Sequence, residues 1–116
     1  MTTGKRAERI AAEYLTGRGF RIIEKNYRAG HKELDLIMTG EDDKRLHIVE
    51  VRSLREPICR MPYESVDKKK IRLIISAARD YIRLKKIDRE IQFDIVSVIF
   101  RPEGTEVQYI PEAFHI

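Results

Sequence analysis

The chain has 116 residues, of which 42% are hydrophobic and 36% charged, so it fits one folded domain over residues 1–116 rather than a disordered chain. Lys and Arg number 23 against 19 Asp and Glu, and the net charge of +4 permits a polyanionic partner without requiring one. The single cysteine, Cys59, excludes an internal disulfide framework and a cysteine-built zinc site. Because the sequence also shows no apolar run of transmembrane length and no signal peptide, we expect a cytoplasmic protein without a membrane partner.

The first part of the chain predicts one helix followed by three strands. Apolar residues recur at helical spacing before Gly17, and short runs rich in β-branched and aromatic residues follow, separated by Gly30 and a polar connection. The expected elements are a helix over 4–17 and strands over 20–27, 34–38 and 46–52. Strands joined by such short connections form an antiparallel meander.

The second part predicts a helix and two strands. Residues 53–66 are irregular, and Asp67 is a good N-cap for a helix over 68–85, where the helical periodicity is strongest. A strand over 91–100, buried on both faces, and a short strand over 106–110 follow. The helix is long enough for a parallel crossover. The expected fold is therefore α/β, in the order α-β-β-β-α-β-β, around a small mixed sheet.

Two acidic residues interrupt apolar strands. Asp35 lies in the second strand and Glu50 in the third, and strand alternation predicts that Leu34, Leu36 and Met38 share the face opposite Asp35. Buried carboxylates are costly unless they are paired or bind metal. Because the strands are adjacent, the two acids can converge and hold a hard cation such as Mg²⁺, with Mn²⁺ as a substitute.

A structural ion pair is the alternative explanation of these acids. Arg52 follows Glu50 by two residues on the same strand face and can neutralise either carboxylate. Spacing alone leaves both alternatives open.

Residues 52–72 concentrate positive charge. The segment contains seven basic and three acidic residues, and Tyr63 within it is available to stack on a base or sugar. Such a segment suits a nucleic-acid backbone, although lysines at a helix start can also be plain solvated surface. The predicted nucleic-acid-binding residues are Arg55, Arg60, Tyr63, Lys68, Lys69, Lys70 and Arg72.

The remaining polar residues carry weaker signals. Glu8, in the first helix, can join the metal site or lie on a polar face. His31, His47 and His115 show no ligand spacing, and Cys59 has no evident partner. We assign no catalytic role to these histidines or to the cysteine.

An ordered set of short motifs resembles the YraN-like family of small bacterial proteins, which are related to Holliday-junction resolvases and restriction endonucleases. The matching positions run through most of the chain. They are Gly4, Ala7, Glu8, Ala11, Tyr14, Leu15, Gly19, Phe20, Asn26–Arg28, Glu33–Ile37, Val49–Arg52, Val66, Lys69, Lys70, Ala77, Ala78, Tyr81, Ile82, Phe93, Asp94, Ala113 and Phe114.

The resemblance implies a restriction-endonuclease-like fold whose active members cleave phosphodiesters with Mg²⁺, using an Asp and a following Glu-x-Lys. It places Asp35 and Glu50 at the two acid positions and Glu8 at the helix acid. Arg52 departs from the pattern by standing where Lys is expected, and Arg and Lys are not interchangeable. Lys32 departs by standing where Gly is usual, which implies a narrower cleft. Lys69 or Lys70 is a possible replacement for the missing lysine.

Three functions remain open. The first is a Mg²⁺-dependent endonuclease acting on branched or structured DNA, with Asp35, Glu50 and Arg52 as catalytic residues. The second is a nucleic-acid-binding module that has lost catalysis through Arg52. The third is a protein-interaction module. By analogy with resolvases, which make two cuts in a four-way junction, a homodimer is an expectation.

Overall fold

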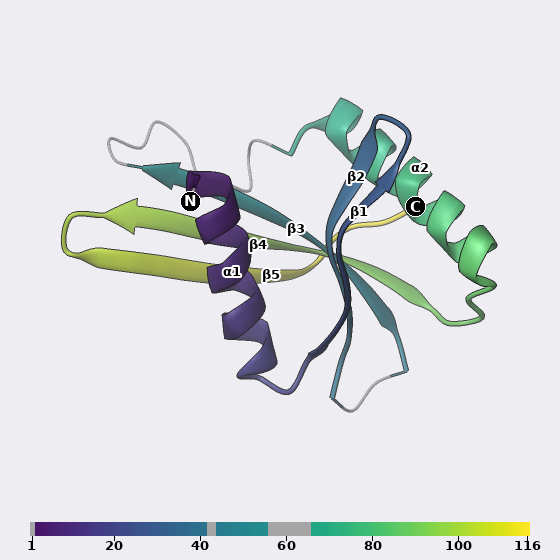
Figure 1. Cartoon of the computed structure of the whole chain (residues 1–116), viewed down its shortest axis with the longest axis horizontal. Coiled ribbons are helices and arrows are strands. Elements are labelled where there is room, and N and C mark those ends of the chain that lie inside the picture. The colour runs from purple at the N-terminus through teal and green to yellow at the C-terminus, as the bar shows by residue number, and fades with distance from the viewer. Residues whose placement is uncertain (1, 42–43, 56–65) are drawn as a thin grey trace.

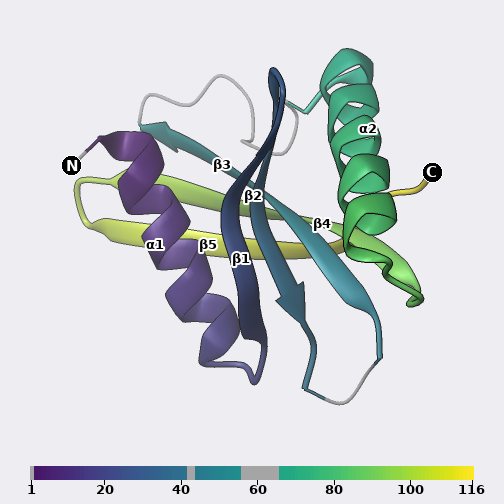
Figure 2. The same cartoon turned by 45° about the vertical axis from the view of Figure 1, so that its right-hand side comes forward.

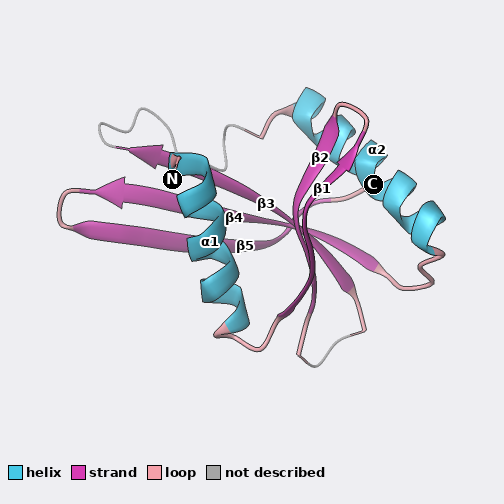
Figure 3. Ribbon diagram, viewed as in Figure 1, coloured by secondary structure: helices cyan, strands magenta, loops and turns pink. Residues whose placement is uncertain are grey.

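The computed structural model describes residues 2–41, 44–55 and 66–116. These residues form α1 (Thr3–Thr16), β1 (Arg21–Ala29), β2 (Lys32–Thr39), β3 (Leu46–Arg55), α2 (Lys68–Lys85), β4 (Ile91–Arg101) and β5 (Gly104–Phe114) (Figure 3). The predicted element order is confirmed. β3 and β5 extend beyond the strands predicted over 46–52 and 106–110, because their ends pair with β4 along its whole length.

The strands form one mixed sheet in the order β1-β2-β3-β4-β5. β1, β2 and β3 are an antiparallel meander, α2 makes the crossover to a parallel β4, and β5 returns antiparallel, as predicted. α1 and α2 lie against opposite faces of this sheet (Figure 2). β4, which lies between β3 and β5, is buried on both faces over most of its length.

Each helix covers one hydrophobic core. α1 buries the small side chains of Ala7, Ala11 and Ala12, which let its backbone approach the sheet closely. α2 packs Ile74 and Tyr81 against the other face. Within the described ranges, no helix combines the length and the apolar character that a membrane crossing requires.

The alternation predicted for the second strand is wrong at Leu34. Leu36 and Met38 lie in the α1 core, whereas Leu34 lies in the α2 core together with Ile37. The change of face falls where the β2–β3 pairing ends, at Leu36 and Val49. On the facing strand, Asn26 adopts a left-handed backbone, φ 50°, between the registered pairs on either side of it. This distortion interrupts the regular pleat of the β1–β2 hairpin.

The sheet divides where β2 and β3 part. Their registered pairs run from Thr39 and Leu46 to Leu36 and Val49. Beyond that point β2 continues beside β1 alone, and β3 continues beside β4 alone (Figure 1). We call this divergence the sheet fork, and Asp35 and Glu50 are the first residues beyond its last pair.

Candidate functional site

A hollow of about 310 Å³ lies in the sheet fork. Because the sheet is open there, side chains from both of its faces reach the same space: α1 contributes from one face and α2 from the other. The hollow is lined by Gly4, Ala7, Glu8, Asp35, Glu50, Val51, Arg52, Ser53 and Lys70. We call it the acid hollow.

Asp35 replaces a backbone partner at the end of the β2–β3 pairing. Its Oδ2 accepts a hydrogen bond of 2.8 Å from the backbone N–H of Val51, a donor that needs a partner once the two strands have separated. Burial, the charge of Glu50 and a hydrogen bond with Glu50 raise the pKa of Asp35 from 3.8 to about 8, against the opposing effect of the Val51 N–H. Asp35 and Glu50 therefore lie within hydrogen-bonding reach of one another.

Glu50 is the most buried acid of the hollow, with 3% of its surface exposed. Two cations approach its Oε2 atom: Arg52 Nη1 from β3 and Lys70 Nζ from α2, each at 3.5 Å. Lys70 is positioned by the start of its helix, because the side chain of the N-cap Asp67 accepts a hydrogen bond from the Lys70 backbone N–H at 2.9 Å.

A second group of acids borders the first. Glu8, Glu33 and Asp35 each offer a carboxylate oxygen, and these three atoms lie within 4.8 Å of one another. Asn26 Nδ2 donates to both Glu8 Oε1 and Glu33 Oε1, at 2.9 and 3.1 Å. The left-handed backbone of Asn26 thus accompanies a side-chain amide that lies between the carboxylates of Glu8 and Glu33, which would otherwise repel one another.

This set of donors fits a hard divalent cation. Mg²⁺ takes oxygen ligands at about 2.0–2.1 Å, so no two of its ligands stand more than about 4.2 Å apart. The three carboxylate oxygens lie within 4.8 Å of one another, so small side-chain movements bring them to one ion. Asp35 is oriented by the Val51 N–H, which donates to its Oδ2. Glu8, Glu33 and Asp35, with Glu50 adjacent, are the residues that can hold such an ion.

The described residues of the predicted basic segment lie at three places. Arg52 and Lys70 line the acid hollow, whereas Lys68, Lys69 and Arg72 are exposed on α2. Arg55 lies on another hollow described below. Arg60 and Tyr63 were predicted to bind nucleic acid and lie outside the described residues, as does Cys59.

Lys32 does not narrow the hollow, contrary to the expectation from the resemblance. Its Nζ donates to Ser76 Oγ at 2.9 Å and to Asp80 Oδ2 at 3.0 Å, both on α2. Hydrogen bonding to Lys32 holds the pKa of Asp80 below its usual value. The lysine therefore joins the β1–β2 hairpin to α2 and leaves the fork open.

Glu33 and Asn26 are the residues of this site that sequence reasoning missed. Both lie in the motifs quoted above, but neither was assigned a role. The signal for Glu33 was its position two residues before Asp35 on a strand. No sequence pattern indicated a role for Asn26, because its contribution depends on a positive φ angle.

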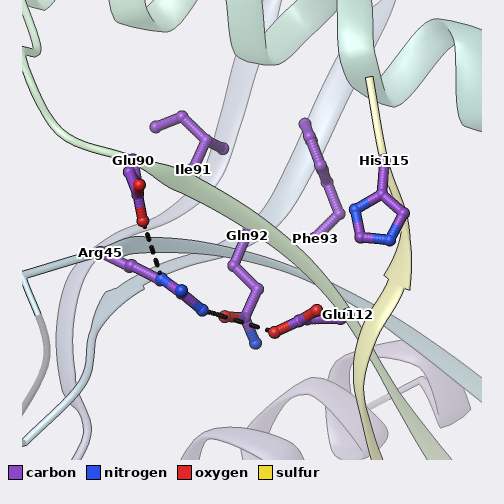
Figure 4. Close-up of a pocket in the computed structure, with 7 residues that line it drawn as sticks. All are labelled: Arg45, Glu90, Ile91, Gln92, Phe93, Glu112 and His115. Carbon is purple, nitrogen blue, oxygen red and sulfur yellow. Dashed lines mark hydrogen bonds and ion pairs between the residues drawn. The ribbon is translucent and has the colours of Figure 1, made fainter.

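None of the three histidines lines the acid hollow within the described residues. His47 Nδ1 contacts Asp94 Oδ2 at 2.8 Å in the α1 core. His115 borders a separate hollow of about 280 Å³, where Arg45 lies between Glu90 and Glu112 at 3.0 and 3.4 Å (Figure 4). The charged groups of that hollow are committed to one another, so it offers no convergent set for chemistry.

The fold and the site define a class: a small α/β domain that holds a carboxylate cluster in the fork of a mixed sheet. The chain belongs to Uncharacterised protein family UPF0102, whose profile matches residues 7–98. A UPF0102 protein of Parabacteroides distasonis is 38% identical over 112 residues, covering 97% of this chain and 91% of the relative. One of Persephonella marina is 38% identical over 114 residues, covering 97% and 93%. The predicted resemblance to an uncharacterised bacterial family is confirmed.

Among solved structures, that of Pyrococcus furiosus SfsA in complex with Ca²⁺ is similar with a TM-score of 0.33 and 16% identity. The match covers 97% of this chain and 64% of that one. A likeness of this size supports no functional inference.

Proposed function

We propose that this protein is a divalent-metal-dependent endonuclease that hydrolyses phosphodiester bonds in branched or structured DNA. The observation that carries the proposal is the convergence of Glu8, Glu33, Asp35 and Glu50 on the sheet fork, with Lys70 beside Glu50. Oxygen-rich clusters of this kind suit Mg²⁺ or Mn²⁺. The preference for branched DNA comes from the family resemblance alone.

The acids of the hollow divide the work. Glu8, Glu33 and Asp35 would hold the ion, which when bound acidifies a water and neutralises charge on the phosphate. Glu50, which is buried and close to Asp35, would orient the attacking water and accept its proton. Asp35 is itself fixed in orientation by the Val51 N–H.

Lys70 offers an ammonium where the expected strand lysine is replaced by Arg52. It reaches the same Glu50 oxygen at 3.5 Å from the first turn of α2, whereas its neighbour Lys69 is exposed. A compact ammonium can sit beside a water and a phosphate oxygen at once, which a planar guanidinium does less readily. We propose that Lys70 takes the catalytic lysine's part and that Arg52 stabilises negative charge on the phosphate.

A nucleic-acid-binding module without catalysis is the second candidate. The contact of Arg52 with Glu50 favours it, because a guanidinium that neutralises the buried carboxylate competes with a metal for the same charge. This candidate predicts DNA binding that is insensitive to divalent ions.

A cleavage assay separates the two candidates. Purified protein is incubated with labelled four-way junctions, duplexes and single strands, with Mg²⁺, with Mn²⁺ or with EDTA. We expect metal-dependent cutting of the branched substrate that falls by about a hundredfold or more in Asp35→Asn and in Glu50→Gln. Absence of cutting with either metal would contradict the proposal.

Lys69 supplies a matched control for Lys70. Lys70→Met should lower the cleavage rate by about a hundredfold, within the range for a lost catalytic group, while Lys69→Met removes the same charge one residue away and should keep activity. Equal losses in the two variants would show that only the overall charge of the helix start matters.

A further inference from the structure

A second hollow, of about 490 Å³, lies where the first turns of α1 meet the β4–β5 turn. Three of its lining residues are arginines. It is bordered by Arg6, Arg55, Phe100, Arg101, Pro102, Gly104 and Thr105. Arg55 and Phe100 are register partners on the parallel strands β3 and β4, so their side chains are neighbours. We call this the arginine hollow.

Two guanidiniums are held over one aromatic ring. The guanidinium carbon of Arg6 lies 5.0 Å from the centroid of Phe100, and that of Arg55 lies 5.5 Å from it. Phe100 is itself nearly buried, so the ring is a fixed platform. Arg55 Nη2 also donates to Thr3 Oγ1 at 3.3 Å, which ties β3 to the start of α1. The contacts with the Phe100 ring therefore hold both guanidiniums in place.

Arg6 and Arg55 differ from Arg101 in their ion pairing within the described part of the chain. Among the described residues, no carboxylate forms an ion pair with either of them, whereas Arg101 is paired with Glu106 at 3.0 Å. Arg45 and Arg83 also contact carboxylates, Glu90 at 3.0 Å and Asp80 at 3.1 Å. Two ordered guanidiniums that have no ion pair within the described residues, beside a hollow, favour an anionic ligand.

The chemistry of that anion follows from the donors. Guanidinium groups recognise phosphate oxygens through paired N–H donors, and ordering them in advance lowers the entropic cost of binding. The hollow is open and lies on an exposed edge, which suits a phosphate within a chain. We infer that the arginine hollow binds a backbone phosphate of the nucleic acid, away from the bond that is cut.

The position relative to the acid hollow supports this assignment, which rests on the proposed function. β3 carries Glu50 in one hollow and Arg55 in the other, five residues along a strand and so about 16 Å away. The first turns of α1 likewise supply Glu8 to one hollow and Arg6 to the other. The separation corresponds to about five steps of 3.4 Å along a duplex strand.

Binding measured without metal tests the inference. Anisotropy of a fluorescein-labelled DNA duplex and four-way junction is recorded in EDTA over a series of salt concentrations. For the double variant Arg6→Gln with Arg55→Gln we expect binding about tenfold weaker at low salt. The plot of log affinity against log salt concentration should become shallower, and the size of its negative slope should decrease by about one for each arginine removed. Both residues are exposed, so circular dichroism should show an intact fold.

The control removes equal charge elsewhere. Arg79→Gln with Lys85→Gln changes two exposed cations on α2, outside both hollows, and should leave the slope within error of the wild type. Equal affinities and slopes in the two double variants, or no DNA binding by the wild type, would overturn the inference. Because no metal is present, the result does not depend on cleavage. If the Arg6 and Arg55 double variant shows the reduced salt dependence but the wild type never cuts DNA, the phosphate site is supported and the proposed nuclease activity is contradicted.

Discussion

At the scale of single residues, Asp35 explains why fork and acid site coincide. Its carboxylate accepts the Val51 N–H that the separating strands leave without a backbone partner. The same carboxylate faces Glu50 and Glu8, both of which raise its pKa. One residue therefore closes the β2–β3 pairing and brings the acids together. Its hydrogen bond with Val51 stabilises the fold, whereas the burial of its carboxyl group beside other acids, which the proposed chemistry needs, destabilises it.

Replacement of Asp35 by Asn should stabilise the metal-free protein, and more so as the pH rises. The folded state holds the Asp35 proton up to a pKa of about 8, while the unfolded chain releases it near 3.8. The wild type therefore loses stability between these two pH values, and the Asn variant does not. Urea unfolding in EDTA at pH 5 and pH 8 measures the gap, which should be larger at pH 8.

The exposed Asp88 gives the reference for that experiment. Asp88→Asn removes a carboxylate that is not buried and should change stability equally at both pH values. A gap for Asp35→Asn that is constant with pH, or that shrinks toward pH 8, would show that the carboxylate is not held protonated in the folded state.

The residue scale also shows what the sequence could reveal. Asp35 and Glu50 were found because acids inside apolar strands are costly and therefore conspicuous. Lys70 was one of two candidates for the missing lysine, and only the Asp67 cap, which sets the rotation of α2, distinguishes it from Lys69. The role of Lys32 was misjudged, because its partners Ser76 and Asp80 are distant in sequence.

At the scale of elements, a buried acid holds the irregular end of β5. A two-residue step in β4, from Phe93 to Ile95, faces a four-residue step in β5, and Glu112 takes a left-handed backbone there. Asp94 Oδ1 accepts from the Glu112 N–H, and its Oδ2 accepts from Tyr109 and contacts His47. The length of β5 was underestimated because such a bulge hides the strand pattern.

Removal of the Asp94 carboxylate should be strongly destabilising. Burial alone would raise its pKa, but hydrogen bonds from His47, the Glu112 N–H and their neighbours hold the pKa below 3.8. Asp94→Ala leaves these buried donors unpaired and should cost about 3–5 kcal/mol in the free energy of unfolding. Tyr109→Phe removes one donor and should cost about 1 kcal/mol. Chemical denaturation at pH 7 measures both.

The pH dependence of the same network has a defined sign. Because the folded-state pKa of Asp94 is lowered, its contribution is present above pH 3.8 and is lost as the pH falls below that value. The stability difference between wild type and Asp94→Asn should therefore shrink in strong acid. A difference that is unchanged down to pH 2 would mean that the carboxylate is not stabilised in its charged form.

At the scale of the whole molecule, the site exists because four elements meet where the sheet opens. The order of helices and strands, the meander and the parallel crossover were all predictable, since they follow from periodicity and short connections. The fork was not, because strand patterns do not state where pairing ends. Glu8 could therefore be named as a candidate, while its approach through the fork to Asp35 could not.

Binding of a divalent ion should stabilise the entire fold, because the acid hollow draws on α1, β2, β3 and α2 and exists only in the folded chain. A ligand that binds the folded state alone adds about 2.7 kcal/mol at one hundred times its dissociation constant. We expect Mn²⁺ or Mg²⁺ to raise the midpoint of thermal unfolding of the wild type and EDTA to reverse the rise. Asp35→Asn combined with Glu8→Gln should abolish the shift, since it removes two of the converging carboxylates. Glu103→Gln, an exposed acid in the β4–β5 turn, should keep it. The same shift in both variants would locate metal binding outside the acid hollow.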